Sequence, residues 1–489
     1  MKRKLSMIIL TAFCLCTLVI GIYSVKNSSV NITRNIEFSV HSPKLNGSEV
    51  WEGTWDSSYN ITLTGVPASA TSGATLEIPE FFYCLDNLKT PASTTTTVNA
   101  VVDEDLTIEE ELSLLDSQGI TWGKGHVKVL GDGTNAIKRM SNYSKINFAN
   151  VTSTLSSISY RAFYNSNLTS LNLSGTSVTT IGSSAFLNSA LTKVELANSS
   201  VSTLGNGVFE GNTNLQTVTL SKKITVLPYA TFANCKALST IDLSNITSIG
   251  DSCFLNAALS SVNIHNGITS IGAEAFNSCA KLTSLTFGDG STNLSIGANA
   301  FKYCTGIKTL NLPSRLTYMG ADAFANCSAI NSITTPFVGQ KPVIENFEFD
   351  KQYHRVTWSF PTTSLTSITI TGGKGNYTLH QYAINQYSYN GNSKFSALKR
   401  VTLGANVTTI EPMALGDCSG ITYFSSPIFA GYTEGGATSY DLWRIFAEPD
   451  GSSPKEYSLP TELTFDFTGT DATFANGSLS YCNIVSFTN

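Results

Sequence analysis

Cysteine is the residue type in this chain whose spacing most invites chemistry. Five of the ten cysteines lie three residues after a recurrent phenylalanine or its equivalent: Cys235, Cys279, Cys304, Cys327 and Cys418. A zinc site would need histidines or a Cys-x-x-Cys pair beside them, and the sequence offers neither. Disulfides are possible in an exported chain, but the same position in other repeats holds Ser166, Ser189, Asn212 and Ala257. We therefore predict small buried side chains that hydrogen-bond to nearby backbone.

No other group of polar residues forms a recognisable catalytic or metal-binding motif. The histidines are far apart in the sequence and match no zinc-protease pattern: His41, His126, His265, His354 and His380. No Gly-x-Ser-x-Gly elbow, Walker loop or paired-carboxylate signature is present, and residues 372–375 are typical of a turn. The acidic residues 103–112 lack the glycine and ligand spacing of a calcium loop, so we interpret them as a short helix with a solvated face. We predict that the chain is not an enzyme and binds no metal or cofactor.

Composition and charge narrow the class of partner. Charged residues make up only 13% of the 489 residues, about half the usual share, and the net charge is −5. Lysines and arginines are scattered along the chain and form no basic stripe, so nucleic acid is not an expected partner. Ser, Thr, Asn and Gly are abundant, which suits an extracellular surface.

Residues 1–24 have the pattern of an export signal. A basic start, residues 1–4, precedes an apolar run that extends to about residue 23. The run is long for a signal peptide and almost long enough to cross a bilayer. We favour cleavage near Ser24, with an uncleaved signal anchor as the alternative. We expect an extracellular or cell-surface location, and contact with a membrane only if this segment is retained.

The elements that position all these residues come from one repeat of roughly 23 residues. Its recurrent phenylalanine is spaced by 23, 23, 23, 22, 22, 25 and 23 residues and occurs at Phe163, Phe186, Phe209, Phe232, Phe254, Phe276, Phe301 and Phe324. In most copies a Leu-x-x-Leu-x-Leu pattern precedes the ring. This combination is typical of a leucine-rich repeat solenoid, in which each repeat buries its apolar face on its neighbours. We predict one parallel β-strand per repeat over residues 151–336, in a β-rich fold with short turns.

A second apolar pair follows each predicted strand, as in Val178 with Ile181 and Ile268 with Ile271. A small residue then stands directly before the phenylalanine, as in Ala275 before Phe276. We expect the pair and the ring to fill the opposite wall of the core. Aligned rings in successive repeats should form a buried spine, because each buried phenylalanine contributes roughly 1.5 to 3 kcal/mol.

The complete unit, Leu-x-x-Ile-x-Leu followed by Val-Thr-x-Ile-Gly-x-x-Ala-Phe-x-x-Cys, resembles the BspA-like leucine-rich repeat family of cell-surface proteins. The resemblance is most specific in residues 271–279, which read IGAEAFNSC, and in residues 323–327, which read AFANC. It covers residues 155–336 and one later copy that ends at Cys418. Leu227 and Pro228 replace Ile-Gly in one repeat. The resemblance implies an adhesin that contacts host matrix proteins or other microbes and has no catalytic motif in its repeats.

Regions with weaker patterns flank the repeats. Residues 27–150 contain short alternating runs and are predicted to be a small, mostly β N-terminal region, either a separate domain or a degenerate start of the solenoid. After residue 336 the period fades and then returns with Leu415 in the phenylalanine position, so we predict degenerate repeats with insertions over residues 337–429. Residues 430–489 are predicted to form an irregular C-terminal cap, which a solenoid needs.

Side chains that flank the middle apolar residue of each strand are predicted to share the concave face of the sheet, because side chains alternate along a strand. This candidate binding face consists of Ser170, Asn172, Lys193, Glu195, Thr217, Thr219, Thr240, Asp242, Ser261, Asn263, Ser284, Thr286, Thr309 and Asn311. Eight strands would form a strip roughly 40 Å long, enough for a protein or an extended polymer. The strip lacks Trp, Tyr and Arg, which dominate most hot spots, so a solvated face without a partner is the alternative.

A second candidate surface is an aromatic patch in the degenerate repeats. It consists of Trp358, Tyr377, Tyr382, Tyr387 and Tyr389. These rings could stack on sugars or anchor a partner, or they could pack in the core of the degenerate coils.

Three functions are consistent with these patterns. The favoured one is an exported, surface-displayed or secreted protein that binds an extracellular protein or glycan of a host or of a neighbouring microbe. The alternative is a structural spacer of the cell surface that binds nothing. The least favoured is an enzyme whose active part lies in a flanking region.

Overall fold

The computed structural model of the chain describes the repeats in full and the flanks in part. The described residues are 34–39, 50–55, 60–67, 73–78, 82–85, 122–138, 140–338, 360, 363–380, 383–384, 395–411, 414–415, 418, 420–428, 432–434, 437–439, 445–446, 463–467 and 484–488. The expected export signal, residues 1–24, and the expected helix, residues 103–112, lie outside them. The chain forms two compact units: unit 1 is Met1–Ile224 with Cys235–Ala237, and unit 2 is Thr225–Asn234 with Leu238–Asn489.

Within its described residues, unit 1 contains three sheets and two short 3-10 helices. The largest sheet has the order β1-β2-β3-β6-β8-β10-β12, with β5 also paired to β6. Its strands are Arg34–Ser39 (β1), Val50–Trp55 (β2), Asn60–Gly65 (β3), Phe82–Leu85 (β5), Trp122–Leu130 (β6), Ser157–Ile158 (β8), Thr180–Ile181 (β10) and Thr203–Leu204 (β12). The second sheet, β13-β11-β9, consists of Ser170–Asn172 (β9), Lys193–Glu195 (β11) and Thr217–Thr219 (β13). The remaining elements are Ala74–Glu77 (β4) paired with Tyr143–Asn147 (β7), and the 3-10 helices Met140–Asn142 (η1) and Ala149–Val151 (η2).

Unit 2 contains five sheets among its described residues. A five-stranded sheet, β14-β15-β17-β19-β21, consists of Val226–Leu227, Ser248–Ile249, Ser270–Ile271, Leu294–Ile296 and Leu316–Met319. A seven-stranded sheet, β20-β22-β23-β25-β27-β30-β31, consists of Thr309–Asn311, Ser332–Thr335, Ser367–Ile370, Arg400–Leu403, Tyr423–Ser426, Leu463–Phe467 and Ile484–Thr488. The three two-stranded sheets pair Ser261–Ile264 (β16) with Ser284–Phe287 (β18), Tyr377–Leu379 (β24) with Val407–Ile410 (β26), and Tyr432–Glu434 (β28) with Ala437–Ser439 (β29).

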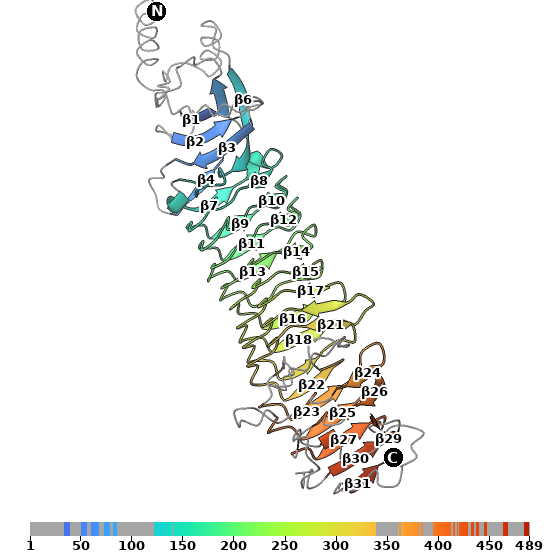
Figure 1. The fold of residues 1–489 in the computed structure, drawn as a ribbon. Helices are drawn as coiled ribbons and strands as arrows, with labels where there is room; N and C mark the ends of the chain where they lie inside the picture. The colour runs from blue at the N-terminus through green and yellow to red at the C-terminus, as the bar shows by residue number, and fades with distance from the viewer. Residues whose placement is uncertain are drawn as a thin grey trace, which may run out of the picture. The chain divides into compact units, whose positions relative to one another are not determined.

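Each complete repeat forms one coil with strands on two of its sides, except that the repeat around Ile241 lacks the first strand (Figure 1). We call the first the repeat strand; it carries the Leu-x-x-Leu-x-Leu pattern, as in β9 and β11, where Leu171 lies opposite Val194 in a parallel pair. The predicted parallel strand is therefore confirmed. The second apolar pair, which we expected only to fill the core, forms a second parallel sheet, as in β17 and β19, where Ile271 lies opposite Ile296. Both sheets arise because their inward apolar residues are buried on the next coil.

The third side of each coil is a turn around the recurrent phenylalanine, and it too is hydrogen-bonded to the next coil. In unit 1 the N–H of Phe163 donates to the carbonyl of Ala185 at 2.7 Å, and in unit 2 Phe276 does the same to Ala300 at 2.7 Å. The residues two before and two after the ring adopt the left-handed conformation, as at Glu274 (φ 56°). Glycine or asparagine tolerates this conformation best, and asparagine often stands two residues after the ring, as at Asn326 (φ 60°).

The Ile-Gly step brings the backbones of successive coils close together. A Cβ atom added at Gly272 would lie 2.5 Å from the backbone nitrogen of Asp251 in the preceding coil. Only glycine leaves room for this approach, which explains why glycine follows the second strand in most repeats.

The recurrent phenylalanines stack as predicted. In unit 1 the ring centroids of Phe163 and Phe186 are 5.0 Å apart with the planes at 16°. In unit 2 the ring of Phe301 lies 4.9 Å from those of both Phe276 and Phe324. All of these rings are buried. They therefore form a continuous apolar spine within each unit.

The N-terminal strands of unit 1 continue the sheet of the repeats. Strand β8 is the first strand that the second apolar pair of a repeat forms. Strand β6 pairs in parallel with β8, and β3 pairs in parallel with β6. Strand β4 likewise pairs in parallel with β7. Of the two interpretations left open by the sequence, this register favours a degenerate start of the solenoid, with β1, β2 and β5 added in antiparallel pairs.

The degenerate repeats of unit 2 keep the coil plan with insertions. Their repeat strands β22, β23, β25, β27, β30 and β31 pair in sequence order and in parallel. Phe360 stacks on Phe324 at 6.1 Å, and the N–H of Ile384 donates to the carbonyl of Ala414 as a phenylalanine does elsewhere. Leu415 occupies the next spine position, as predicted. We expected an irregular region after residue 430, but β30 and β31 extend this sheet.

One expected strand is absent from the repeats. The segment with Ile241 between Thr240 and Asp242 has no strand pairing, and Ile241 is only half-buried. The Asp242 carboxylate accepts the N–H of Ser244 at 2.9 Å, but Asn172 on the intact strand β9 makes the same contact with Ser174, so this turn does not explain the missing strand. In unit 2 the ladder also stops between β18 and β20. The repeat strands therefore form sheets of three, two and seven strands, where we expected a single run of eight.

Candidate binding face

The structure places most of the predicted face residues on repeat strands with their side chains in solvent. In unit 1 the six residues from Ser170 to Thr219 lie in three aligned pairs on β9, β11 and β13. In unit 2, β16, β18 and β20 carry the residues from Ser261 to Asn311, whereas Thr240 and Asp242 lie on no strand. Ser170 and Glu195 are half-buried and the other twelve are exposed.

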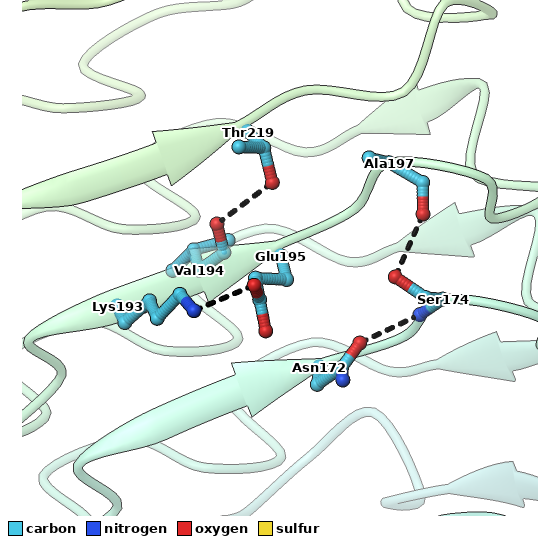
Figure 2. A network of polar contacts seen from close by, with 7 residues as sticks. All are labelled: Asn172, Ser174, Lys193, Val194, Glu195, Ala197 and Thr219. Atoms are coloured by element: carbon cyan, nitrogen blue, oxygen red, sulfur yellow. Dashed lines mark hydrogen bonds and ion pairs between the residues drawn. The ribbon is translucent and has the colours of Figure 1, made fainter.

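A small polar network covers the face in unit 1 (Figure 2). Lys193 Nζ lies 2.6 Å from Glu195 Oε1, an exposed ion pair that contributes at most about 1 kcal/mol. The Thr219 hydroxyl donates to the carbonyl of Val194 at 3.5 Å, and Asn172 accepts the N–H of Ser174 at 2.9 Å. This part of the face is held in place largely by its own contacts.

The hydroxyl at the start of a repeat strand and the hydroxyl just before it differ in their hydrogen bonding. The preceding hydroxyls donate to carbonyls of the previous coil, as Thr192 does to Thr169 at 3.0 Å in unit 1 and Thr283 does to Ser260 at 3.3 Å in unit 2. The hydroxyl residues one position later form a second column. Within the described part of the chain, the side chains of this column make no hydrogen bond at Ser170, Thr217, Thr240, Ser261, Ser284 and Thr309. These hydroxyls remain available to a partner.

The face continues beyond the predicted strip along the seven-stranded sheet of unit 2. The same alternation places Ser332 and Thr334 on β22, Ser367 and Thr369 on β23, Arg400 and Thr402 on β25, Tyr423 on β27, and Thr464 and Asp466 on β30. Arg400 is exposed and the others are half-buried, whereas Ser425 on β27 is buried. Sequence reasoning missed these residues. The copy around Val401 had been recognised, so its flanking residues Arg400 and Thr402 could have been found by the same rule.

Arg400, Tyr423 and Asp466 form one connected group on this extension. Arg400 Cζ lies 3.5 Å from the centroid of the Tyr423 ring, and the two residues are register partners on β25 and β27. The Tyr423 hydroxyl donates to Asp466 Oδ2 at 2.7 Å. This hydrogen bond, and secondly burial, raise the pKa of Tyr423, so the phenol stays protonated and keeps donating. The group supplies the arginine and tyrosine that the predicted strip lacks.

The recurrent cysteines hold neighbouring coils together through their thiols. In unit 2, Cys279 Sγ donates to the carbonyl of Phe254 at 3.2 Å, Cys304 to Phe276 at 3.2 Å, and Cys327 to Phe301 at 3.0 Å. In unit 1 the Ser189 hydroxyl makes the equivalent bond to Phe163 at 2.8 Å. The predicted small, backbone-bonded position is confirmed. None of the six described cysteines outside β5 forms a disulfide, and all six are buried.

Burial also determines the acidity of these thiols. It raises the pKa of Cys235, Cys279 and Cys327 to about 12, and it raises that of Cys304 well above the ordinary value of 9.0. A thiol of this kind is neutral at physiological pH and a poor nucleophile. The ladder is therefore structural rather than reactive.

The histidines have separate surroundings. His265 Nδ1 accepts the N–H of Gly267 at 3.0 Å, so its Nε2 carries the proton and donates to the carbonyls of Leu243 and Ile246 at 3.1 and 3.0 Å. His380 lies 3.3 Å from Glu411, and His126 is on β6. His41 and His354 lie outside the described residues. No group of three or more metal-ligating side chains comes together in the part of the chain that the structure describes.

The aromatic patch is only partly visible. Tyr377 is 2% exposed on β24, and its hydroxyl accepts the N–H of Val338 at 3.0 Å. Burial raises its pKa, so the ring is a core residue and offers no stacking surface. Trp358, Tyr382, Tyr387 and Tyr389 lie outside the described residues.

Comparisons with known proteins agree with this architecture. The BspA type Leucine rich repeat region matches in six copies, over residues 135–258 and 247–371. No curated protein matches the chain. Within the described residues, no helix has the length and apolar character needed to span a membrane.

Solved structures of bacterial leucine-rich repeat proteins are similar to the chain at low identity. A leucine-rich repeat protein from Bacteroides ovatus is 12% identical, covers 78% of this chain and 94% of its own, and has a TM-score of 0.33. A leucine rich cell surface protein from Faecalibacterium prausnitzii is 15% identical, with coverages of 92% and 95% and a TM-score of 0.31. The pneumococcal vaccine antigen PcpA is 13% identical, with coverages of 93% and 98% and a TM-score of 0.39.

Parallel strands that recur once per repeat, with a phenylalanine spine and hydrogen-bonded turns, define a leucine-rich repeat protein. The repeat region of this chain belongs to the BspA type of leucine-rich repeat.

Proposed function

We propose that this chain is exported, is displayed on the cell surface or secreted, and binds an extracellular protein or glycan of a host or neighbouring microbe through the exposed face of its repeat strands. The observation that carries the proposal is the column of hydroxyls that make no side-chain hydrogen bond within the described residues, as at Ser284 and Thr309. The hydroxyls of the neighbouring column donate to carbonyls of the preceding coil. That neighbouring column therefore joins coils, whereas the column of Ser284 and Thr309 can bind a partner.

The chemistry of the described residues supports binding rather than catalysis. The thiols are buried and carry raised pKa values, and His265 is engaged by three backbone groups. The face instead presents hydroxyl, amide and a few charged groups at a regular spacing of about 4.8 Å between strands. Such a surface suits an extended partner that lies across several strands.

An array of extracellular matrix proteins and glycans, probed with the purified chain, tests the proposal. A face variant combines Ser284→Arg with Thr309→Arg, two exposed positions on β18 and β20. A matched control combines Thr305→Arg with Ser328→Arg, which are exposed but lie on turns. We expect the wild type and the control to bind the same ligand and the face variant to lose it. Binding that survives in the face variant would refute the proposal, and no binding by the wild type would favour a structural spacer.

A further inference from the structure

The seven-stranded sheet of unit 2 carries a group whose chemistry points to one kind of ligand. We propose that Arg400, Tyr423 and Asp466 anchor a carboxylate-bearing polysaccharide, a polymer of uronic acids, on the face of this sheet where Arg400 is exposed and Tyr423 and Asp466 are half-buried. The proposal rests on the binding function proposed above and specifies the chemistry of the partner.

The guanidinium of Arg400 is prepared for a carboxylate. It lies over the ring of Tyr423 with Cζ 3.5 Å from the ring centroid, and the ring is fixed by its hydrogen bond to Asp466. A guanidinium that lies over an aromatic face keeps its N–H groups directed outward from its edge, where they can bind both oxygens of one carboxylate. Because the Tyr423 ring, itself fixed by Asp466, already holds the arginine, less conformational entropy is lost when a ligand binds.

The charge pattern of the sheet provides one pairing position for a negatively charged group. Among the described face residues of β20 to β30, Arg400 is the only cation, and the only anion, Asp466, is bound by the Tyr423 hydroxyl. Nucleic acids are bound by many cations at once. Arg400 can pair with one carboxylate of a polyuronate, and the hydroxyls of the adjacent sugar units can meet the hydroxyls of the strands.

The residues around the group favour a sugar polymer over an acidic protein. The same face presents the hydroxyls of Ser332 and Thr334 on β22, Ser367 and Thr369 on β23, and Thr402 on β25. Its exposed positions carry no aliphatic side chain within the described residues, whereas protein interfaces are built on an apolar or aromatic core. Hydroxyls beside an anchored arginine match a partner whose own groups are hydroxyls and carboxylates.

Equilibrium binding of the full chain to polygalacturonate tests the proposal, with fully methyl-esterified polygalacturonate and poly-L-glutamate as comparison probes. We expect wild-type binding to the free polyuronate, with the ester and the polypeptide at least roughly tenfold weaker. Arg400→Gln should lose roughly tenfold or more, and Arg400→Lys should also weaken binding because lysine has no planar fork. Lys281→Gln, an exposed cation outside the face, should bind like the wild type. Each variant is compared with the wild type by its urea unfolding midpoint, so that a folding defect is recognised.

The outcomes separate this proposal from the more general one. If the wild type binds an array ligand but not polygalacturonate, or if Arg400→Gln binds polygalacturonate normally, the polyuronate proposal is wrong and the general function stands. Tighter, Arg400-dependent binding of poly-L-glutamate would overturn the sugar assignment in favour of an acidic peptide. If the wild type binds no probe on the array either, both proposals fail.

Discussion

Cys304 donates its thiol hydrogen to the carbonyl oxygen of Phe276 in the preceding coil, with a distance of 3.2 Å between sulfur and oxygen. The same carbonyl accepts the backbone N–H of Cys279 at 3.1 Å. A single oxygen therefore closes the turn of its own coil and bonds the next coil to it. Because the position recurs, a chain of such bonds runs along the phenylalanine spine.

Substitution of Cys304 should distinguish the hydrogen bond from simple packing. Cys304→Ser keeps a donor and should change the free energy of unfolding little, since Ser189 makes the same bond in unit 1. Cys304→Val fills the space but removes the donor, and we expect a loss of about 1 to 3 kcal/mol. Urea denaturation followed by circular dichroism measures both. Equal stability of the serine and valine variants would show that the thiol contributes only volume.

The buried thiols should make the protein sensitive to alkaline pH. Burial raises the pKa of Cys279 from 9.0 to about 12 in the folded chain. Below the unfolded pKa both states hold the proton and the stabilisation is complete. As pH rises from 9 towards 12, the unfolded chain loses the proton first, so the free energy of unfolding should fall by up to about 1.4 kcal/mol per pH unit. In Cys279→Ser this contribution should vanish, and an unchanged slope between pH 9 and 11 would contradict the assignment.

Truncation of a central spine residue should be costly. Phe301 stacks on rings at 4.9 Å on both sides and is fully buried. Phe301→Ala should lower the free energy of unfolding by about 3 to 5 kcal/mol, because it removes the apolar contacts and leaves a cavity. Phe301→Leu should cost clearly less, since Leu415 fills the equivalent position without exposure. Thermal and urea unfolding of the two variants check this order, and a mild alanine phenotype would show that the spine is dispensable.

Tyr303 should be a position where asparagine is more stable than alanine. It is 47% exposed and holds the left-handed conformation (φ 60°) that asparagine holds at the equivalent Asn326. A residue other than glycine or asparagine pays about 1 to 2 kcal/mol there. We expect Tyr303→Asn to be more stable than Tyr303→Ala by about 0.5 to 1 kcal/mol. Both variants lose the ring, so their difference in unfolding free energy reports the backbone alone, and no difference would mean that the turn is unstrained.

The apolar pattern of each repeat predicted a stack of coils. It gave little indication of the second sheet. The leucines and phenylalanines recur at a period that only a stack of coils can bury. The second sheet was harder to foresee, because strands such as β17 have two residues and carry almost no alternation. The left-handed turn did leave a signal, the asparagine two residues after the ring at Asn165, Asn188, Asn234, Asn256 and Asn326.

The candidate site was predictable wherever the period was intact. Alternation around Leu171 or Leu310 placed the flanking residues on the exposed face, as the structure shows. Tyr423 lies one 23-residue period after its register partner Arg400, so the same rule could have found it. Asp466 could not be found in this way, because its register partner Ser425 lies 41 residues earlier, far outside the period. The insertions that lengthen these coils bring together residues that sequence spacing separates.

Alkylation of introduced thiols tests directly whether the exposed face of the repeat strands binds the partner. Thr309→Cys places a thiol on the face, and Thr305→Cys places one on a nearby exposed turn. The parent chain supplies the background rate, and its six cysteines from Cys235 to Cys418 are buried. With the strongest array ligand present, the account predicts that alkylation of Thr309→Cys slows severalfold while Thr305→Cys reacts at its free rate. Equal rates at Thr309→Cys with and without the ligand, or protection only at Thr305→Cys, would contradict it.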